Sequence, residues 1–131
     1  MVAIFSVKPD YADRILSGEK KVEFRRVKCK KDIDTILIYA TQPIAKIIGE
    51  VSVANVIEDT KEALWNFTSS CAGIEHEDFL RYYKDKRNAI AYVLEKPHRY
   101  KELLDISAYG LSTPPQSFRY LPEHEMFALR G

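Results

Sequence analysis

The first apolar positions of the chain follow a strand pattern and then a helix pattern. Residues 2–7 are mostly apolar and branched or aromatic, which predicts a short strand buried on both faces. Pro9 then fits the first turn of a helix, and the apolar residues between Tyr11 and Leu16 recur at the spacing of one helical stripe. Gly18 suits a left-handed cap at the end of that helix. A strand followed directly by a helix is therefore expected at the start of the chain.

From Lys20 to Lys28 the period changes to two. This pattern predicts a strand whose faces differ, with Val22 and Phe24 on one side and Glu23 and Arg25 on the other.

Later segments switch between strand and helix patterns without an internal repeat. The pattern predicts strands at 35–40, 45–56 and 89–95, and helices at 60–68 and 75–84. Gly49 inside the long strand indicates a bulge or a tight bend. Residues 103–131 contain three prolines and two glycines, which predicts mostly loop with short turns or one short strand. We expect an α+β domain of five or six strands around a small curved or closed sheet, with two or three short helices.

The composition fits one globular domain spanning residues 1–131. With 46% hydrophobic residues, 5 glycines and 6 prolines, the chain is not collagen-like, coiled-coil or disordered. The two cysteines, Cys29 and Cys71, are too few for a disulfide scaffold or a four-cysteine zinc site, and they indicate reduced thiols. The chain has no leader pattern at its start, and no apolar run approaches the roughly 20 residues of a membrane span. We expect a cytoplasmic protein that does not enter a membrane.

Charge is unevenly distributed although the net charge is only +1. Residues 1–31 carry nine basic and four acidic side chains, a net charge of +5, whereas the remaining residues carry a net charge of −4. This asymmetry indicates either an anionic partner at one face or a solvated surface without a binding role.

Three charged side chains of the 20–28 strand offer the most specific chemistry. Gly18, Lys20, Glu23 and Arg25 form the pattern Gly-x-Lys-x-x-Glu-x-Arg. An arginine can hold phosphate with two hydrogen bonds, a lysine supplies a point charge, and a carboxylate accepts hydrogen bonds from a base or a sugar. The alternative is a surface ladder of ion pairs that contributes about 0–1 kcal/mol.

This motif resembles the signature of the ASCH domain family. The preceding segment from Phe5 to Gly18 and the later segment from Ile44 to Val53 also resemble that family, and Pro114 to Tyr120 is similar to the tail of its prokaryotic and phage-borne members. The resemblance implies a PUA-like β-barrel with a cleft over the motif, in which RNA or a nucleotide binds. It also implies a regulator of transcription, translation or RNA modification.

The resemblance implies an enzymatic alternative as well. One branch of the family hydrolyses the acetyl amide of N4-acetylcytidine, and ribonuclease activity is attributed to another member. Lys20 corresponds to the lysine of the amidohydrolase branch, but Glu23 stands where that branch has threonine. Its catalytic glutamate lies on a later helix, for which Glu75 and Glu77 are the candidates here.

Seven further residues are candidates for binding nucleic acid, and Lys8, Tyr39 and Glu50 each have a structural alternative. Lys8 follows the first strand and either opens onto the cleft or is a plain surface lysine. Tyr39 and Thr41 end a strand and could supply a stacking ring and a hydroxyl, whereas core packing is the alternative for Tyr39. Glu50 follows the strand glycine and either lines the cleft or pairs with a lysine. The remaining candidates lie in the tail, which is expected to fold back over the barrel: Gln116, Ser117 and Arg119.

No cofactor or metal site is expected from the motifs. The three histidines are far apart, and five glycines cannot supply a dinucleotide or phosphate-binding loop. The leading hypothesis is therefore an RNA- or nucleotide-binding domain. The alternatives are a small enzyme acting on modified nucleosides or RNA, with Lys20 as the catalytic residue, and a protein-interaction domain.

Overall fold

The computed structural model describes residues 1–121 and contains six strands and three α-helices in that range. The elements in chain order are β1 (Val2–Val7), α1 (Pro9–Ser17), β2 (Val22–Arg25), β3 (Thr35–Ala40), β4 (Lys46–Thr60), α2 (Lys61–Thr68), α3 (His76–Tyr82), β5 (Asn88–Leu104) and β6 (Phe118–Leu121). Short 3-10 turns follow α2 and β5. The predicted tail beyond residue 121 lies outside the described residues.

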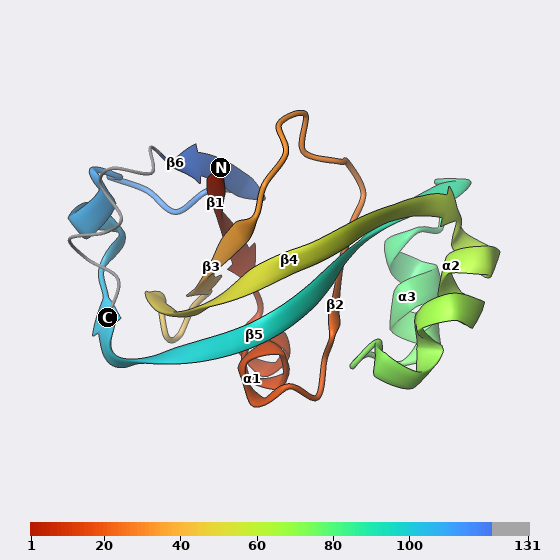
Figure 1. The fold of residues 1–131 in the computed structure, drawn as a ribbon, viewed down its shortest axis with the longest axis horizontal. Helices are drawn as coiled ribbons and strands as arrows, with labels where there is room; N and C mark the ends of the chain where they lie inside the picture. The colour runs from red at the N-terminus through yellow and green to blue at the C-terminus, as the bar shows by residue number, and fades with distance from the viewer. Residues whose placement is uncertain (122–131) are drawn as a thin grey trace.

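The six strands form one mixed sheet in the order β2-β5-β4-β3-β1-β6 (Figure 1). β1 and β3 run parallel, with Val2 opposite Thr35, and every other neighbouring pair is antiparallel. The predicted α+β class is confirmed. The sheet is curved but not closed into a barrel, because β2 and β6 remain as its two edges.

The helix after β1 forms as its sequence predicts. Pro9 occupies the first turn, and the buried side chains of Ala12, Ile15 and Leu16 make one apolar stripe against the sheet. Gly18 ends the helix at φ 85°, in the left-handed region. The chain therefore reverses sharply at Gly18 and enters β2.

Gly49 allows a close contact between α1 and the sheet. A Cβ atom at this position would lie 2.5 Å from the backbone oxygen of His98 and 2.8 Å from a methyl carbon of Leu16. The β-ladders on both sides of Gly49 shift register here, so the predicted bulge is confirmed.

Two strands extend well past their predicted ends. β4 continues to Thr60, and β5 runs through Pro97 to Leu104. The polar residues at the end of β4 remain in the strand because they pair with the start of β5 in a two-stranded ribbon. Pro97 is accommodated by a register shift, in which His98 pairs with Glu50 and Glu95 pairs with Ser52. Strand pairing extended these elements beyond their apolar pattern.

The far end of this ribbon holds α2 and α3 together (Figure 1). Leu64 of α2 and Phe79 of α3 are buried with Phe24 of β2 in one cluster, where the rings of Phe24 and Phe79 lie 4.9 Å apart. A second cluster packs α1 against one face of the sheet, and a third covers the opposite face. These clusters fix α1 and α3 on either side of β2.

Candidate functional site

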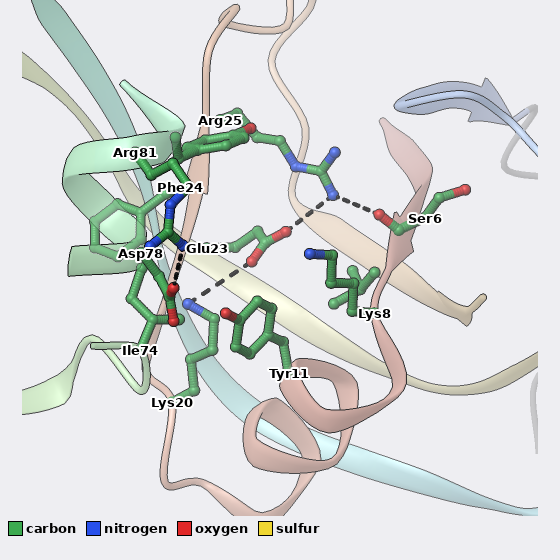
Figure 2. Close-up of a pocket in the computed structure, with 12 residues that line it drawn as sticks. Ser6, Lys8, Tyr11, Lys20, Glu23, Phe24, Arg25, Ile74, Asp78 and Arg81 are labelled. Atoms are coloured by element: carbon green, nitrogen blue, oxygen red, sulfur yellow. Dashed lines mark hydrogen bonds and ion pairs between the residues drawn. The ribbon is translucent and has the colours of Figure 1, made fainter. Parts of the chain in front are cut away.

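A cavity of about 350 Å³ lies among the end of β1, the start of α1, β2 and α3 (Figure 2). Four of the sequence candidates line it, namely Lys8, Lys20, Glu23 and Arg25. We call it the β2 cavity. The three charged residues of the motif therefore converge in one concave site.

Lys20 lies at the base of the β2 cavity, and the residue is only 2% exposed. Its Nζ donates a hydrogen bond to the backbone oxygen of Ala72 at 2.9 Å and lies 3.8 Å from Oε1 of Glu23. The same Nζ lies 4.9 Å from the centroid of the Phe24 ring. Burial lowers the pKa of Lys20, and the carboxylate of Glu23 opposes this shift.

The segment after α2 covers Lys20. A Cβ atom at Gly73 would lie 2.5 Å from the Cβ of Lys20, and Gly73 has φ 65°. Arg14 donates a hydrogen bond to the backbone oxygen of Gly73 at 2.7 Å, and Lys21 donates its N–H to the oxygen of Cys71 at 3.0 Å. This backbone cover keeps the lysine stem out of water, so the amine is directed toward Glu23.

Arg25 joins the two open edges of the sheet. Its Nη2 donates to Oε2 of Glu23 at 2.9 Å and to the backbone oxygen of Ser6 at 3.0 Å. Its Nη1 donates to the hydroxyl oxygen of Ser117 at 3.1 Å, just before β6. The guanidinium also lies 4.5 Å from the centroid of the Phe5 ring. These bonds connect β2 with the β1 and β6 edge that the sheet itself leaves open.

The terminal nitrogens of Arg25 are already engaged in the structure. Its Nε is buried and has no hydrogen-bond partner among residues 1–121. The two-pronged phosphate contact expected from the sequence would therefore have to compete with Ser6, Glu23 and Ser117. In this arrangement Arg25 contributes its positive charge to the cavity.

The cavity has an excess of positive charge and several aromatic rings. Lys8 enters from the β1 side with its amine directed toward the cavity, and Arg81 pairs with Asp78 on α3 at 2.9 Å (Figure 2). Among residues 1–121, four cationic and two acidic side chains line the cavity. Burial raises the pKa of Tyr11 and of Tyr82 above the ordinary value of 10.0, so both ring hydroxyls are neutral hydrogen-bonding groups at pH 7.

The profile of the ASCH domain family matches residues 5–102, which is most of the chain. This chain belongs to the ASCH domain family. It is 30% identical over 129 residues to the "ASCH domain-containing ribonuclease" of Zymomonas mobilis, covering 94% of this chain and 86% of that protein. The crystal structure of an ASCH protein from Zymomonas mobilis superposes with a TM-score of 0.90 and 26% identity, covering 98% of this chain and 92% of that one.

Longer proteins also match this ASCH domain, over only part of their own length. The chain spans 15% of a protein from Ureaplasma parvum named ATP synthase subunit alpha, at 24% identity over 90% of this chain. It spans 33% of the "Large ribosomal subunit protein uL22" of the same species, at 29% identity over 79% of this chain.

The other sequence candidates lie outside the β2 cavity lining of this ASCH domain. Ser117 contacts Arg25 directly, as described above. Tyr39 is buried in the core cluster on the opposite sheet face, and Glu50 accepts a hydrogen bond from the Tyr100 hydroxyl at 2.8 Å. Thr41 forms the turn after β3, where its N–H bonds the oxygen of Val7 at 3.0 Å. Gln116 and Arg119 are exposed.

Sequence reasoning missed the contribution of α3. Asp78, Arg81 and Tyr82 line the cavity, whereas Glu75 and Glu77, the two candidates for a helix carboxylate, are exposed and do not. Asp78, Arg81 and Tyr82 lie at i, i+3 and i+4, which places them on one face of the helix. This spacing could have indicated from the sequence that the three side chains act together. What the sequence could not supply was the packing of α3 against β2.

The described part of the chain holds neither a metal cluster nor a membrane-spanning helix. No three histidine, cysteine, aspartate or glutamate side chains are grouped so that they could hold a metal ion there. In the same range, no helix combines the length and the apolar character needed to cross a membrane.

Proposed function

We propose that this ASCH domain binds RNA by accepting a single nucleotide in the β2 cavity. The observation that carries the proposal is the convergence of Lys20, Glu23 and Arg25 in a concave site. A cavity of about 350 Å³ is at the small end of ligand sites, which suits one nucleotide and excludes a duplex. The excess of cationic side chains favours a ligand with a phosphate.

The individual groups match the parts of a nucleotide. A protonated lysine has three N–H donors, and two of those on Lys20 are directed at Ala72 and Glu23, which leaves one for a ligand oxygen. The Glu23 carboxylate has lone pairs besides those facing Lys20 and Arg25, and these accept from an amino group or a ribose hydroxyl. The rings of Tyr11 and Tyr82 border the cavity and offer faces on which a base can stack.

The curated relative supports RNA as the class of ligand. A protein 30% identical to this chain carries the name "ASCH domain-containing ribonuclease". As a binding module, this domain would regulate transcription, translation or RNA modification through the RNA it holds.

Lys20 and its neighbour Lys21 provide a matched test. Lys21 is exposed and does not line the β2 cavity, so Lys21→Met removes the same charge outside the site. We expect Lys20→Met to weaken binding of labelled single-stranded RNA and of nucleoside monophosphates at least tenfold, while Lys21→Met changes it less than threefold. Equal effects of the two substitutions, or none, would exclude the β2 cavity as the binding site.

A second candidate function is chemistry on bound RNA or on a modified nucleoside. The observation that favours it is the buried Lys20 amine, whose pKa is lowered by burial. A neutral amine can accept the proton of an attacking ribose hydroxyl or water, and Asp78 lines the same cavity. For amide hydrolysis, Glu23 would occupy the place of a hydroxyl residue.

Incubation with labelled RNA and with N4-acetylcytidine, with and without Mg²⁺, separates binding from catalysis. Cleavage or deacetylation that is lost in Lys20→Met and retained in Lys21→Met assigns the chemistry to the β2 cavity. Its rate would rise with pH as Lys20 loses its proton. Binding without turnover of either substrate leaves the domain as a binding module.

A further inference from the structure

A second cavity, of about 310 Å³, lies beneath the loop that joins β2 to β3. The loop comprises residues 26–34, and we call it the lysine loop. It projects at the top of the view in Figure 1, opposite α1. Lys28 and Lys31 of the loop line this cavity, with β4 residues 53–56 and Tyr92 on its other side. We call it the loop cavity.

The lysine loop is anchored at several points. The Cys29 N–H donates to the hydroxyl of Tyr92 at 2.8 Å, and the Lys31 N–H donates to the hydroxyl of Tyr120 at 3.1 Å. Cys29 and Ile33 are 5% and 8% exposed, so their side chains fix the loop in the core. The loop cavity is therefore formed before any ligand binds.

The lysines of this loop lack acidic partners. Lys28, Lys30 and Lys31 are exposed, and within residues 1–121 no carboxylate lies within ion-pair distance of them. Asp32 is the one acidic side chain that lines the loop cavity. Arg26, the first residue of the loop, is by contrast paired with Asp85 at 2.7 Å. Among residues 1–121, Lys28 and Lys31 line the loop cavity beside Asp32, while Lys30 lies in the same loop outside the lining. The other acid of the loop, Asp34, pairs with the N-terminal amine at 3.1 Å. The resulting excess of cations suits a polyanion.

The loop cavity follows the β2 cavity closely along the chain. Arg25 lines the first cavity and Lys28 lines the second, and three residues span at most about 11 Å. Through the core, the buried Phe5 ring contacts one lining residue of each cavity, 4.5 Å from the Arg25 guanidinium and 5.4 Å from the Tyr92 ring. A short strand of RNA with one nucleotide in the β2 cavity can therefore reach the lysine loop.

We propose that the lysine loop and its cavity bind the phosphodiester backbone of the RNA strand whose nucleotide occupies the β2 cavity; this rests on the proposed function. RNA is favoured over an acidic protein because the charge excess continues from one cavity to the next. Both cavities also have an aromatic ring in their lining. Beside the loop, Lys31 Nζ lies 5.1 Å from the centroid of the Tyr120 ring. Phosphate contacts of this kind fix position without reading sequence.

The test compares a long and a short ligand on two double variants. Lys28→Ala/Lys31→Ala removes the lysines of the loop cavity, and Lys84→Ala/Lys101→Ala removes two exposed lysines that line neither cavity. Binding of a labelled single strand of about 12 nucleotides is measured by fluorescence anisotropy against salt, and binding of a nucleoside monophosphate by calorimetry. A 12-residue polyglutamate serves as the acidic-protein probe.

We expect the loop variant to reduce the salt slope for the RNA strand by about 1.4, since each single-strand phosphate contact contributes about 0.7. Its affinity for the monophosphate should equal that of the wild type, and the control variant should keep the wild-type slope. Lys28→Arg/Lys31→Arg, which retains both charges, should restore the slope.

Three results overturn the proposal. An unchanged slope in the loop variant removes the lysine loop from the RNA path. An equal loss of monophosphate affinity means that the loop acts only by supporting the β2 cavity. Polyglutamate binding as tight as RNA binding and equally dependent on Lys28 and Lys31 assigns the loop to a protein partner. Failure of the wild type to bind either RNA ligand refutes the proposed function itself, which is a separate outcome.

Discussion

Arg25→Met tests whether Arg25 stabilises the fold by joining the two edges of the sheet. Arg25 is 8% exposed, and its guanidinium contacts Glu23, Ser6 and Ser117 at 2.9, 3.0 and 3.1 Å. Methionine retains apolar volume beside Phe5 but makes none of these hydrogen bonds. The substitution therefore separates the charged contacts from the packing.

The expected loss is smaller than the sum of the three bonds. Hydrogen bonds to charged groups contribute about 1.5–3 kcal/mol each, but the variant also no longer has to bury a guanidinium. Removing one partner of a buried ion pair costs about 3–5 kcal/mol. We expect the lower end of that range, because Nζ of Lys20 still lies 3.8 Å from Glu23. This corresponds to a Tm lower by roughly 10–20 °C.

Urea denaturation at pH 7 measures this loss, with Arg26→Met as the control. Arg26 donates hydrogen bonds to Asp85 and to the backbone oxygen of Tyr82, but its side chain is 39% exposed, so its loss should cost clearly less than the loss of Arg25. Glu23→Gln/Arg25→Met should recover about 1 kcal/mol relative to Arg25→Met, because it also removes the carboxylate that was left behind. An Arg25→Met variant no less stable than Arg26→Met would refute the edge-joining role.

Three further predictions concern Lys20, its cover and the buried tyrosines. In urea denaturation, Gly73→Ala should destabilise the fold by about 1–3 kcal/mol more than Gly18→Ala. Both glycines have positive φ, but only at Gly73 would the added Cβ collide with Lys20. Equal losses of stability would contradict this packing. Lys20→Met should be more stable than the wild type at neutral pH, and this difference should shrink as pH rises toward 10.5. Burial lowers the pKa of Lys20, so in that window the unfolded wild type binds more protons than the folded one and the wild type gains stability with pH. A difference in denaturation midpoints that does not change with pH would argue against a buried charged amine. Burial raises the pKa of Tyr83 and of Tyr92 above 10.0, so the stability of the fold should decrease as pH rises past 10. In denaturation midpoints measured from pH 9 to 11, Tyr83→Phe should show a smaller decrease than the wild type. An equal decrease would contradict the burial of the Tyr83 hydroxyl.

The elements with a strong apolar period were predictable from the sequence. β1, α1 and β3 lie where the pattern placed them, and Gly18 and Gly49 have the cap and bulge roles expected of them. Local preferences decided these features, because a helical stripe or a left-handed cap depends on nearby residues only. The ends of β4 and β5 were missed because they depend on each other across the sheet.

Four of the ten candidate site residues line the β2 cavity, and Ser117 reaches it through Arg25. Lys20, Glu23 and Arg25 were found because their types and spacing form a motif within one segment. Asp78 and Tyr82 were missed because nothing near them in the chain indicates that α3 packs against β2. Tyr39 has the chemistry of a stacking residue, but its register in β3 turns it into the core of the opposite face.

The sequence by itself determined that Glu23 and Arg25 stand together on one strand and that a helix ending at Gly18 precedes them. Both are consequences of period and backbone conformation over a few residues. The strand predicted from Lys20 to Lys28 is shorter in the structure, because β2 comprises only Val22–Arg25 and Lys20 lies before it. Only the tertiary structure decided that the amine of Lys20 is buried under Gly73 and that the guanidinium of Arg25 joins the sheet edges. The physical reason is that burial and hydrogen-bond partners come from segments 19 to 92 positions away, whose approach is set by packing of the whole core.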